Sequence, residues 1–177
     1  GHPNIPRAAN EVEVFDRALS ATEIQAMFLA GSNGKCKGTD TPPTVPFAAL
    51  DAKVEIELGP LANDDAFEVK ATFTLGAGSN GIDPLTEDVS FQVGTFSTTI
   101  PAGSFHFKPA KPGKHGKPGK PAQFTFEGVI DAVAVEAKIT PLGANSFEFK
   151  AEGEGADLTG TVNPVTLGLT IGDDSGS

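Results

Sequence analysis

Apolar and polar residues alternate with a period of two through most of the chain from Lys53 to Ile171. The pattern is clearest at Phe67–Leu75, where Phe, Val, Ala, Phe and Leu alternate with charged residues and threonines. This period is typical of strands that bury one face, as in antiparallel sheets. Similar runs occur at 54–58, 89–93, 96–100, 105–107, 124–126, 133–139, 147–151 and 165–171. The pattern predicts an all-β fold, an antiparallel sandwich or barrel of about eight or nine strands.

The alternating region repeats itself. VEIELGPLANDDAFEVK at Val54–Lys70 is followed about 80 residues later by VEAKITPLGANSFEFK at Val135–Lys150. Each copy has a strand-like run, a Pro-Leu turn, a short loop and a second alternating run. Two copies are too few for a solenoid, so we expect an internal pseudo-twofold duplication within one domain. The domain is expected over residues 50–177, with copies at about 54–107 and 124–177.

One short helix is expected near the N-terminus. Ser20 and Glu23 have the spacing of a capping box, in which each side chain satisfies backbone N–H groups of the first helical turn. Ile24, Met27 and Phe28 follow as one apolar stripe. The pattern predicts a helix from Ala21 to Leu29, preceded by a short strand at Glu11–Phe15.

The segment NEVEVFDRALSATEIQAMFLAGSNGKCK resembles the C-terminal end of a bacterial laminin-G-like (concanavalin-A-like) domain. The matched motif is Arg17, Ala18, Leu19, Ser20, Glu23 and Ile24. The resemblance covers only residues 1–37, so no sugar or calcium site of that family transfers. It implies that residues 1–37 are the strand-helix tail of such a domain in an extracellular bacterial protein.

Residues 50–177 resemble an unnamed, duplicated β-repeat found near the C-termini of large secreted bacterial proteins. The phrases that carry this resemblance are FEVKATFTLG and LTIGDDSG. No activity is attached to that type of repeat. The resemblance therefore implies a secreted or cell-surface location and no chemistry.

Three segments break the alternation. Residues 38–49 are rich in Pro and Thr and predict an extended linker. The closing GDDSGS is polar, and we expect it to fray. Residues 108–121, KPAKPGKHGKPGKP, predict a solvated, polyproline-like loop. Alternatively, this loop is a basic finger that binds anionic polysaccharide or the acidic body of another copy. Its lysines are Lys108, Lys111, Lys114, Lys117 and Lys120.

Composition and net charge disfavour several classes of binding partner. The formal net charge of −10 opposes binding to nucleic acid or anionic membranes. The sequence contains no run of 18 apolar residues, so we expect no membrane insertion. Thirteen Phe residues, with no Trp or Tyr, make Phe the main large core residue and disfavour sugar stacking. Cys36 is the only cysteine of the sequence, and it is either a free thiol or the disulfide partner of a cysteine outside this chain.

Candidate chemistry is sparse. The three histidines lack zinc-site spacing, and no nucleophile elbow is present. We therefore predict that the protein is not an enzyme and needs no cofactor, with calcium as the one possible exception. Asp83, Glu87 and Asp88 lie in one loop, where carboxylate oxygens could bind calcium. The alternative is that these acids are simply solvated.

These observations favour a non-catalytic structural or adhesive extracellular module that associates with itself or with other extracellular proteins. One route is strand addition, in which Glu11–Phe15 pairs with an exposed sheet edge of its own or a neighbouring copy. The alternative is a binding module for anionic polysaccharide or calcium. A hydrolase is the least favoured reading.

Overall fold

The computed structural model describes residues 44–61, 63–113 and 118–177. The chain divides into two units, Gly1–Thr41 and Pro42–Ser177, and every described residue belongs to the second. Several expectations from the sequence concern residues outside the described part: the strand at 11–15, the helix at 21–29, the laminin-G-like motif, Cys36, Lys114 and Lys117.

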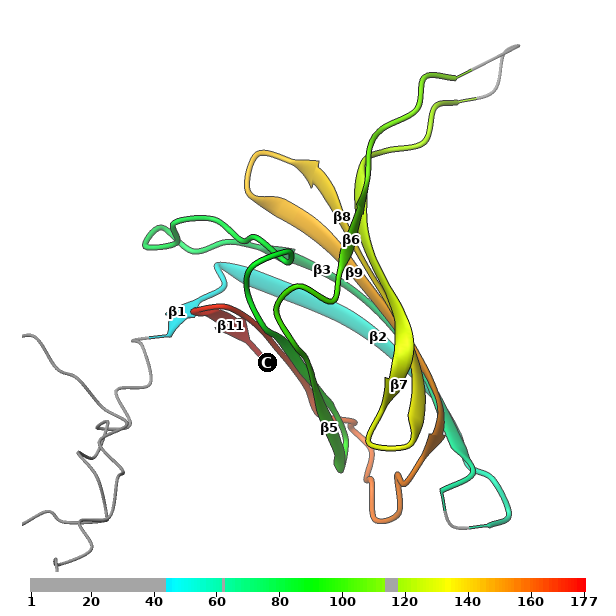
Figure 1. The fold of residues 1–177 in the computed structure, drawn as a ribbon. Coiled ribbons are helices and arrows are strands. Elements are labelled where there is room, and N and C mark those ends of the chain that lie inside the picture. Colours follow the sequence, from blue (N-terminus) through cyan, green and yellow to red (C-terminus); the bar gives the residue numbers. More distant parts are fainter. Residues whose placement is uncertain (1–43, 62, 114–117) are drawn as a thin grey trace, which may run out of the picture. The chain divides into compact units, whose positions relative to one another are not determined.

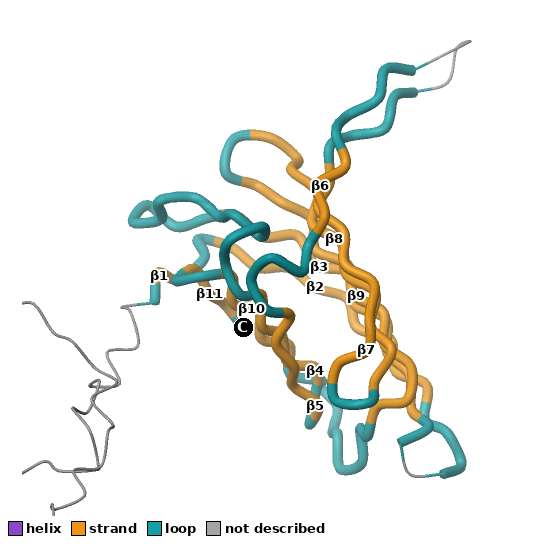
Figure 2. The backbone as a smooth tube through the Cα atoms, viewed as in Figure 1, coloured by secondary structure: helices purple, strands orange, loops and turns teal. Residues whose placement is uncertain are grey.

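The described residues form two β-sheets without a helix (Figure 1, Figure 2). The five-stranded sheet has the order β1 (Val45–Pro46), β11 (Asp174–Gly176), β10 (Leu167–Ile171), β4 (Val89–Val93) and β5 (Phe96–Ile100). The six-stranded sheet has the order β2 (Ala49–Glu57), β3 (Asp65–Thr74), β9 (Ser146–Ala156), β8 (Val133–Gly143), β7 (Gln123–Ile130) and β6 (His106–Lys108). Neighbouring strands are antiparallel, except that β1 runs parallel to β11.

The core lies between the two sheets. The apolar phase of each long strand faces inward, as the period of two predicts. Phenylalanine rings join the layers: the Phe67 ring on β3 lies 5.3 Å from that of Phe96 on β5, and the Phe91 ring on β4 lies 5.6 Å from that of Phe149 on β9. The predicted all-β class is confirmed, and the two layers are those of a β-sandwich. None of the described residues forms a helix of the length and apolarity needed to cross a membrane.

In each sheet one antiparallel pair joins strands that are far apart in the sequence. In the six-stranded sheet β3 pairs with β9, and Lys70 lies opposite Lys150. In the five-stranded sheet β4 pairs with β10, and Phe91 lies opposite Leu169. Each of these strands also pairs with a neighbour in sequence: β3 with β2, β9 with β8, β4 with β5 and β10 with β11.

Both ends of the described region are ordered, unlike the linker and the frayed tail expected from composition. Val45 and Pro46 at the end of the predicted linker form β1, and Phe47 stacks on Phe73 with ring centroids 4.6 Å apart. The C-terminal GDDSGS supplies β11, whose Asp174 is fully buried. Composition predicted an extended linker and a frayed tail, but residues 45–46 and 174–176 pair as two short strands at one edge of the five-stranded sheet.

The Pro-Leu turn expected in both copies is present only in the first. Pro60 lies in the loop after β2, whereas Pro141 and Leu142 lie within β8. The second hairpin is tighter, because Gly143 pairs directly with Ser146. The first strands of the two copies therefore do not superpose in the register that the sequence alignment suggests.

The lysine-rich loop is a hairpin in its described parts. Lys111 and Lys120 form an antiparallel bridge, and each backbone N–H donates to the carbonyl oxygen of the other at 2.9 Å. This arm, residues 108–113 and 118–121, projects beyond the ends of β6 and β7 (Figure 1). It is hereafter called the lysine arm.

Candidate functional site: the outer face of the six-stranded sheet

The outer face of the six-stranded sheet carries its charges in rows that cross the strands. Backbone register places Glu55 opposite Glu68, Glu68 opposite Glu152, Glu152 opposite Glu136, and Glu136 opposite Glu127. One glutamate from each of β2, β3, β9, β8 and β7 thus contributes to a single line. All five side chains are exposed. We call this line the acidic row.

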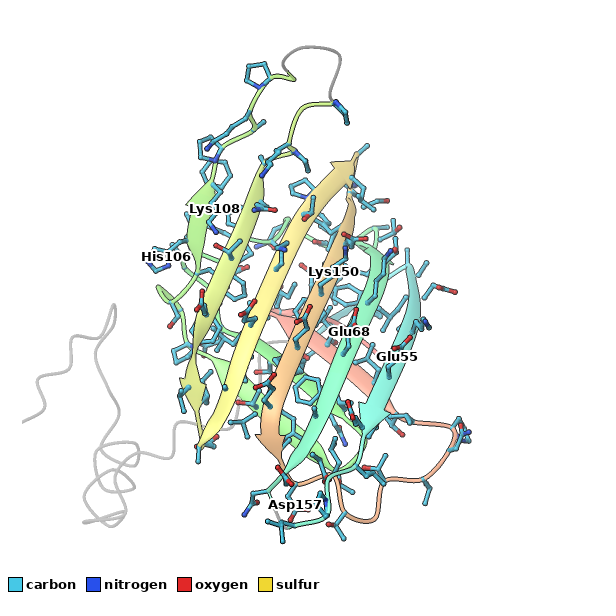
Figure 3. All side chains as sticks on the ribbon, turned by 90° about the vertical axis from the view of Figure 1, so that its right-hand side faces the viewer. Glu55, Glu68, His106, Lys108, Lys150 and Asp157 are labelled. Carbon is cyan, nitrogen blue, oxygen red and sulfur yellow. The ribbon has the colours of Figure 1, made fainter. Side chains whose placement is uncertain are left out.

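A basic row runs beside it, two residues along each strand. It contains Lys53, Lys70, Lys150 and Lys138, in the order β2, β3, β9, β8. Thr125 on β7 and His106 on β6 continue the same line. Figure 3 looks onto this face, with Glu55, Glu68 and Lys150 presented from three adjacent strands.

The spacing of the two rows follows from sheet geometry. Neighbouring strands lie about 4.8 Å apart, so successive charges in a row are separated by about that distance. Residues two positions apart on one strand lie about 6.7 Å apart, which sets the distance between the rows. The face therefore presents one acidic row and one basic row, which run parallel and close together.

Within the described chain three of the four lysines of the basic row form ion pairs, but only one glutamate of the acidic row does so. Lys53 forms an ion pair with Glu55, and Glu148 lies between Lys70 at 3.7 Å and Lys150 at 3.3 Å. The hydrogen bond and charge of Lys53 lower the pKa of Glu55, and the same contact raises the pKa of Lys53. Within the described part of the chain the rest of the acidic row, Glu68, Glu152, Glu136 and Glu127, makes no ion pair.

Rows of like charge do not help this sheet to fold. Like charges directly opposite each other on neighbouring strands destabilise the pair, whereas opposite charges there stabilise it. Exchanging Glu152 with Lys150 would have alternated the signs across β3, β9 and β8 without altering the inward residues. The arrangement is thus a property of the surface and not a requirement of the core.

A shallow hollow over β7, β8 and β9 is lined by members of both rows. Glu136 and Glu152 border one side, Lys138 and Lys150 the other, and Lys108 from the base of the lysine arm joins them. Glu127 on β7 also lines the hollow, so three lysines and three glutamates surround it. The hollow can hold an anionic group beside the arm, or the charged side chains of a facing surface.

The opposite face of the sandwich is different. The outer positions of β4, β5 and β10 carry only uncharged residues: Ser90, Gln92, Ser97, Thr99, Gly168 and Thr170. The hydroxyl groups of Ser90 and Thr99 lie 2.8 Å apart across their strands. Charge is therefore concentrated on one of the two sheet faces.

The predicted calcium residues are not brought together as a ligand set. The backbone N–H of Asp83 donates to Glu87 at 2.7 Å, and that of Ala102 donates to Asp88 at 2.7 Å. The Asp83 carboxylate accepts from the backbone N–H of Leu85 and the hydroxyl of Thr86. The carboxylates of Asp83 and Glu87 thus shape their own loop, and that of Asp88 ties this loop to the turn after β5. No group of three or more His, Cys, Asp or Glu residues able to hold a metal is found in the described ranges.

Three of the five predicted binding lysines are described, and all three are exposed. Lys111 and Lys120 face each other on the arm, and Lys108 ends β6. Because Lys108 also lines the hollow, the arm and the basic row meet at one place.

The alternation in the sequence predicts one outward polar face, but it does not predict the rows. Alternation assigns a residue to a face, and only register assigns it to a row. The turn at Ala144–Asn145 is not sufficient to give that register, because an irregularity between Pro141 and Gly143 shifts the pairing that brings Lys138 opposite Lys150 and Glu136 opposite Glu152.

Comparison with known protein families, curated proteins and solved structures gave no match. The function is therefore argued from the geometry of this chain.

Proposed function

We propose that the chain is a non-catalytic structural or adhesive module of an extracellular or cell-surface protein, and that it works by assembly. The observation that carries the proposal is the exposed face on which an acidic row lies beside a basic row. An ordered charged surface of this kind presents a repeating pattern to a partner, and four of the five glutamates in its acidic row make no ion pair inside the described chain. The two sequence resemblances and the net charge of −10 support the extracellular setting.

We also infer that the sandwich arose by internal duplication. Lys70 and Lys150 occupy equivalent positions of the two sequence copies and lie opposite each other. Gly94 and Gly172 are also equivalent, and both adopt positive φ, at 57° and 58°. A pseudo-twofold axis through the two central strand pairs accounts for both observations.

Strand addition is one route to assembly. β2 is nine residues long and lies at the edge of its sheet, so the outer side of its backbone is available for pairing. The other edge strands are shorter: five residues in β5, three in β6 and two in β1. The predicted strand Glu11–Phe15 is a suitable addition to β2, in the same copy or in a neighbour.

The test is light scattering coupled to size-exclusion chromatography over a wide range of concentrations. We expect the full chain to associate, and a chain lacking residues 1–37 to associate less. Val12→Lys with Val14→Lys is the matched variant, because it removes the apolar phase of the predicted strand and keeps the segment. A full chain that stays monomeric at every concentration, and binds no extracellular partner, would refute assembly.

Anionic polysaccharide is the second candidate partner. The observation that favours it is the meeting of Lys108, Lys138 and Lys150 on the side of one hollow that adjoins the lysine arm, with glutamates lining the other side. A polymer with one carboxylate per sugar could contact the arm and the hollow together. Such binding would weaken with added salt.

A further inference from the structure

We propose that two copies of this chain stack through the outer faces of their six-stranded sheets, with the acidic row of each lying over the basic row of the other. The inference rests on the proposed function, since it names the partner for assembly. It differs from strand addition because it uses the face of the sheet and not its edge.

The geometry follows from one symmetry operation. A twofold axis is placed in the interface, parallel to the rows and midway between them, above Val69 and Ala151. Rotation about this axis preserves the order of the strands and reverses their direction, so each strand lies over the same strand of the second copy. Because the axis is equidistant from the two rows, it exchanges acidic positions with basic ones.

Four kinds of facing charge pair result, and the symmetry forms each of them twice. They are Glu55 with Lys53, Glu68 with Lys70, Glu152 with Lys150, and Glu136 with Lys138. Stacked sheets lie about 10 Å apart, a gap that a lysine and a glutamate side chain bridge together. For two flat sheets every member of the basic row would face a glutamate of the second copy, and Glu127 would face the hydroxyl of Thr125.

A second copy matches this surface better than a simple polyion. A polyanion on the basic row would lie about 6.7 Å from the acidic row, and a polycation on the acidic row would meet the lysines at the same distance. A partner must carry both signs, in parallel lines, at the strand spacing. The same face of a second copy has this pattern by construction.

The match is confined to the two central rows. In the next rows Glu154 would lie over Glu148 of the second copy, and Glu57 would lie over Asp51, so both charge pairs there are of like sign. Twisted sheets stack at an angle of about 30°, which carries the corners of the two faces apart. Contact is therefore limited to the middle of β3, β9 and β8, and the association is weak and sensitive to salt.

The experiment exchanges the charges in full-length chains. One variant, Lys70→Glu with Lys138→Glu and Lys150→Glu, has acid in both rows. A second, Glu68→Lys with Glu136→Lys and Glu152→Lys, has base in both rows. Sedimentation velocity in about 50 mM salt measures the dissociation constant, and thermal melting of each variant verifies folding. We expect each variant alone to lose at least about tenfold in self-association, which corresponds to about 1.4 kcal/mol.

Two combinations test the geometry itself. Mixing the two variants should restore association as a heterodimer, because the faces are again opposite in sign. A chain with all six exchanges has its rows interchanged, and it should associate with itself like the original. A simple disruption of the surface would not be rescued in either case.

The basic variant also separates face pairing from general repulsion. Three Glu→Lys exchanges, at two charge units each, change the formal net charge from −10 to −4. Lower net charge alone would strengthen association, whereas face pairing requires it to weaken. Gln92→Lys with Ser97→Lys and Thr99→Lys, on the uncharged face, is the control; it also makes the net charge less negative, and it should not weaken association.

Several results would overturn the proposal. These are a basic variant that associates as tightly as the original, a mixture that stays monomeric, or association only when a polyuronate is added. Association that is lost on deleting residues 1–37 and unaffected by the face variants would assign assembly to the strand edge, so the proposed function would survive without the face pairing. Absence of any association would refute both assembly as the function and the pairing of the two faces.

Discussion

At the scale of single residues, Asp65 at the start of β3 connects two loops that are far apart in sequence. Its carboxylate is buried and accepts the backbone N–H of Gly59 at 2.9 Å and that of Leu158 at 2.8 Å. We expect Asp65→Ala to lower the free energy of unfolding by about 2–4 kcal/mol, because two backbone donors lose their acceptor in a buried place. Urea denaturation of the two chains measures this loss in the free energy of unfolding. Asp64→Ala, at an exposed neighbour, should change stability by less than about 0.5 kcal/mol.

Asp174, unlike Asp65, is a buried carboxylate whose two oxygens do not both have a hydrogen-bond partner. Burial raises its pKa, the Ser79 hydroxyl at 2.8 Å opposes the rise, and the charge of Asp173 adds to it. The other carboxylate oxygen has no hydrogen-bond partner among the described residues. Because the folded state disfavours the ionised form, the charge destabilises the fold at neutral pH. That penalty disappears as the pH falls below the ordinary aspartate range.

Asp174→Asn should therefore raise the melting temperature at pH 7, and the gain should shrink towards pH 3. Calorimetry at the two pH values measures this difference. Asp157→Asn provides a control of opposite sign, because hydrogen bonds from Thr159 lower the pKa of Asp157. Its charge stabilises the fold above the ordinary aspartate pKa, so that variant should lose stability at pH 7 and little at pH 3. Equal gains for Asp174→Asn at both pH values would contradict the assignment.

At the scale of elements, β9 depends on a glycine beneath an aromatic ring. Gly153 lies opposite Phe67 on β3, and a Cβ at Gly153 would overlap the Phe67 ring. We expect Gly153→Ala to cost about 1–3 kcal/mol through this overlap. Adding Phe67→Leu should recover part of the loss, so that a double-mutant cycle gives a clear coupling energy. Gly168→Ala is the control, since its Cβ would make only ordinary contact with Gln92, at 3.6 Å.

The sequence predicted the strands and their inward faces because alternation depends on local burial alone. It did not predict the register, which depends on where each turn falls. Asp131 and Ala132 form a two-residue turn with positive φ and without glycine, so no turn residue marked it. Pro141 suggested a turn where β8 continues. β1 and β11 are stabilised by pairing between distant segments, which composition could not reveal.

At the scale of the whole sandwich, the two outer faces have separate characters. The face of the five-stranded sheet is neutral at β4, β5 and β10, and the face of the six-stranded sheet holds both charged rows. The candidate calcium residues and the lysine arm were predicted as isolated loops. Only the fold shows that these acids accept hydrogen bonds from backbone and hydroxyl groups of the loops, while the base of the arm adjoins the charged face. The surface that a partner would contact is therefore determined by the arrangement of the whole six-stranded sheet.

The lysine arm allows the final prediction, because it can be removed without touching the core. Lys108 pairs with Gln123, so residues 109–122 can be replaced by Asn-Gly, a two-residue sequence suited to a tight hairpin. The described residues of this segment contribute nothing to the buried cluster, so the melting temperature should change by less than about 2 °C. Calorimetric titration with a polyuronate, at about 50 mM and 300 mM salt, measures binding. The original chain should bind the polymer more weakly at the higher salt concentration. Removal of the arm should lower the affinity at least about tenfold. Lys111→Ala with Lys120→Ala should give an intermediate loss, and self-association through the charged face should be unchanged. If the shortened chain binds the polymer as tightly as the original, the arm is not its binding site, and the basic row becomes the place to substitute next.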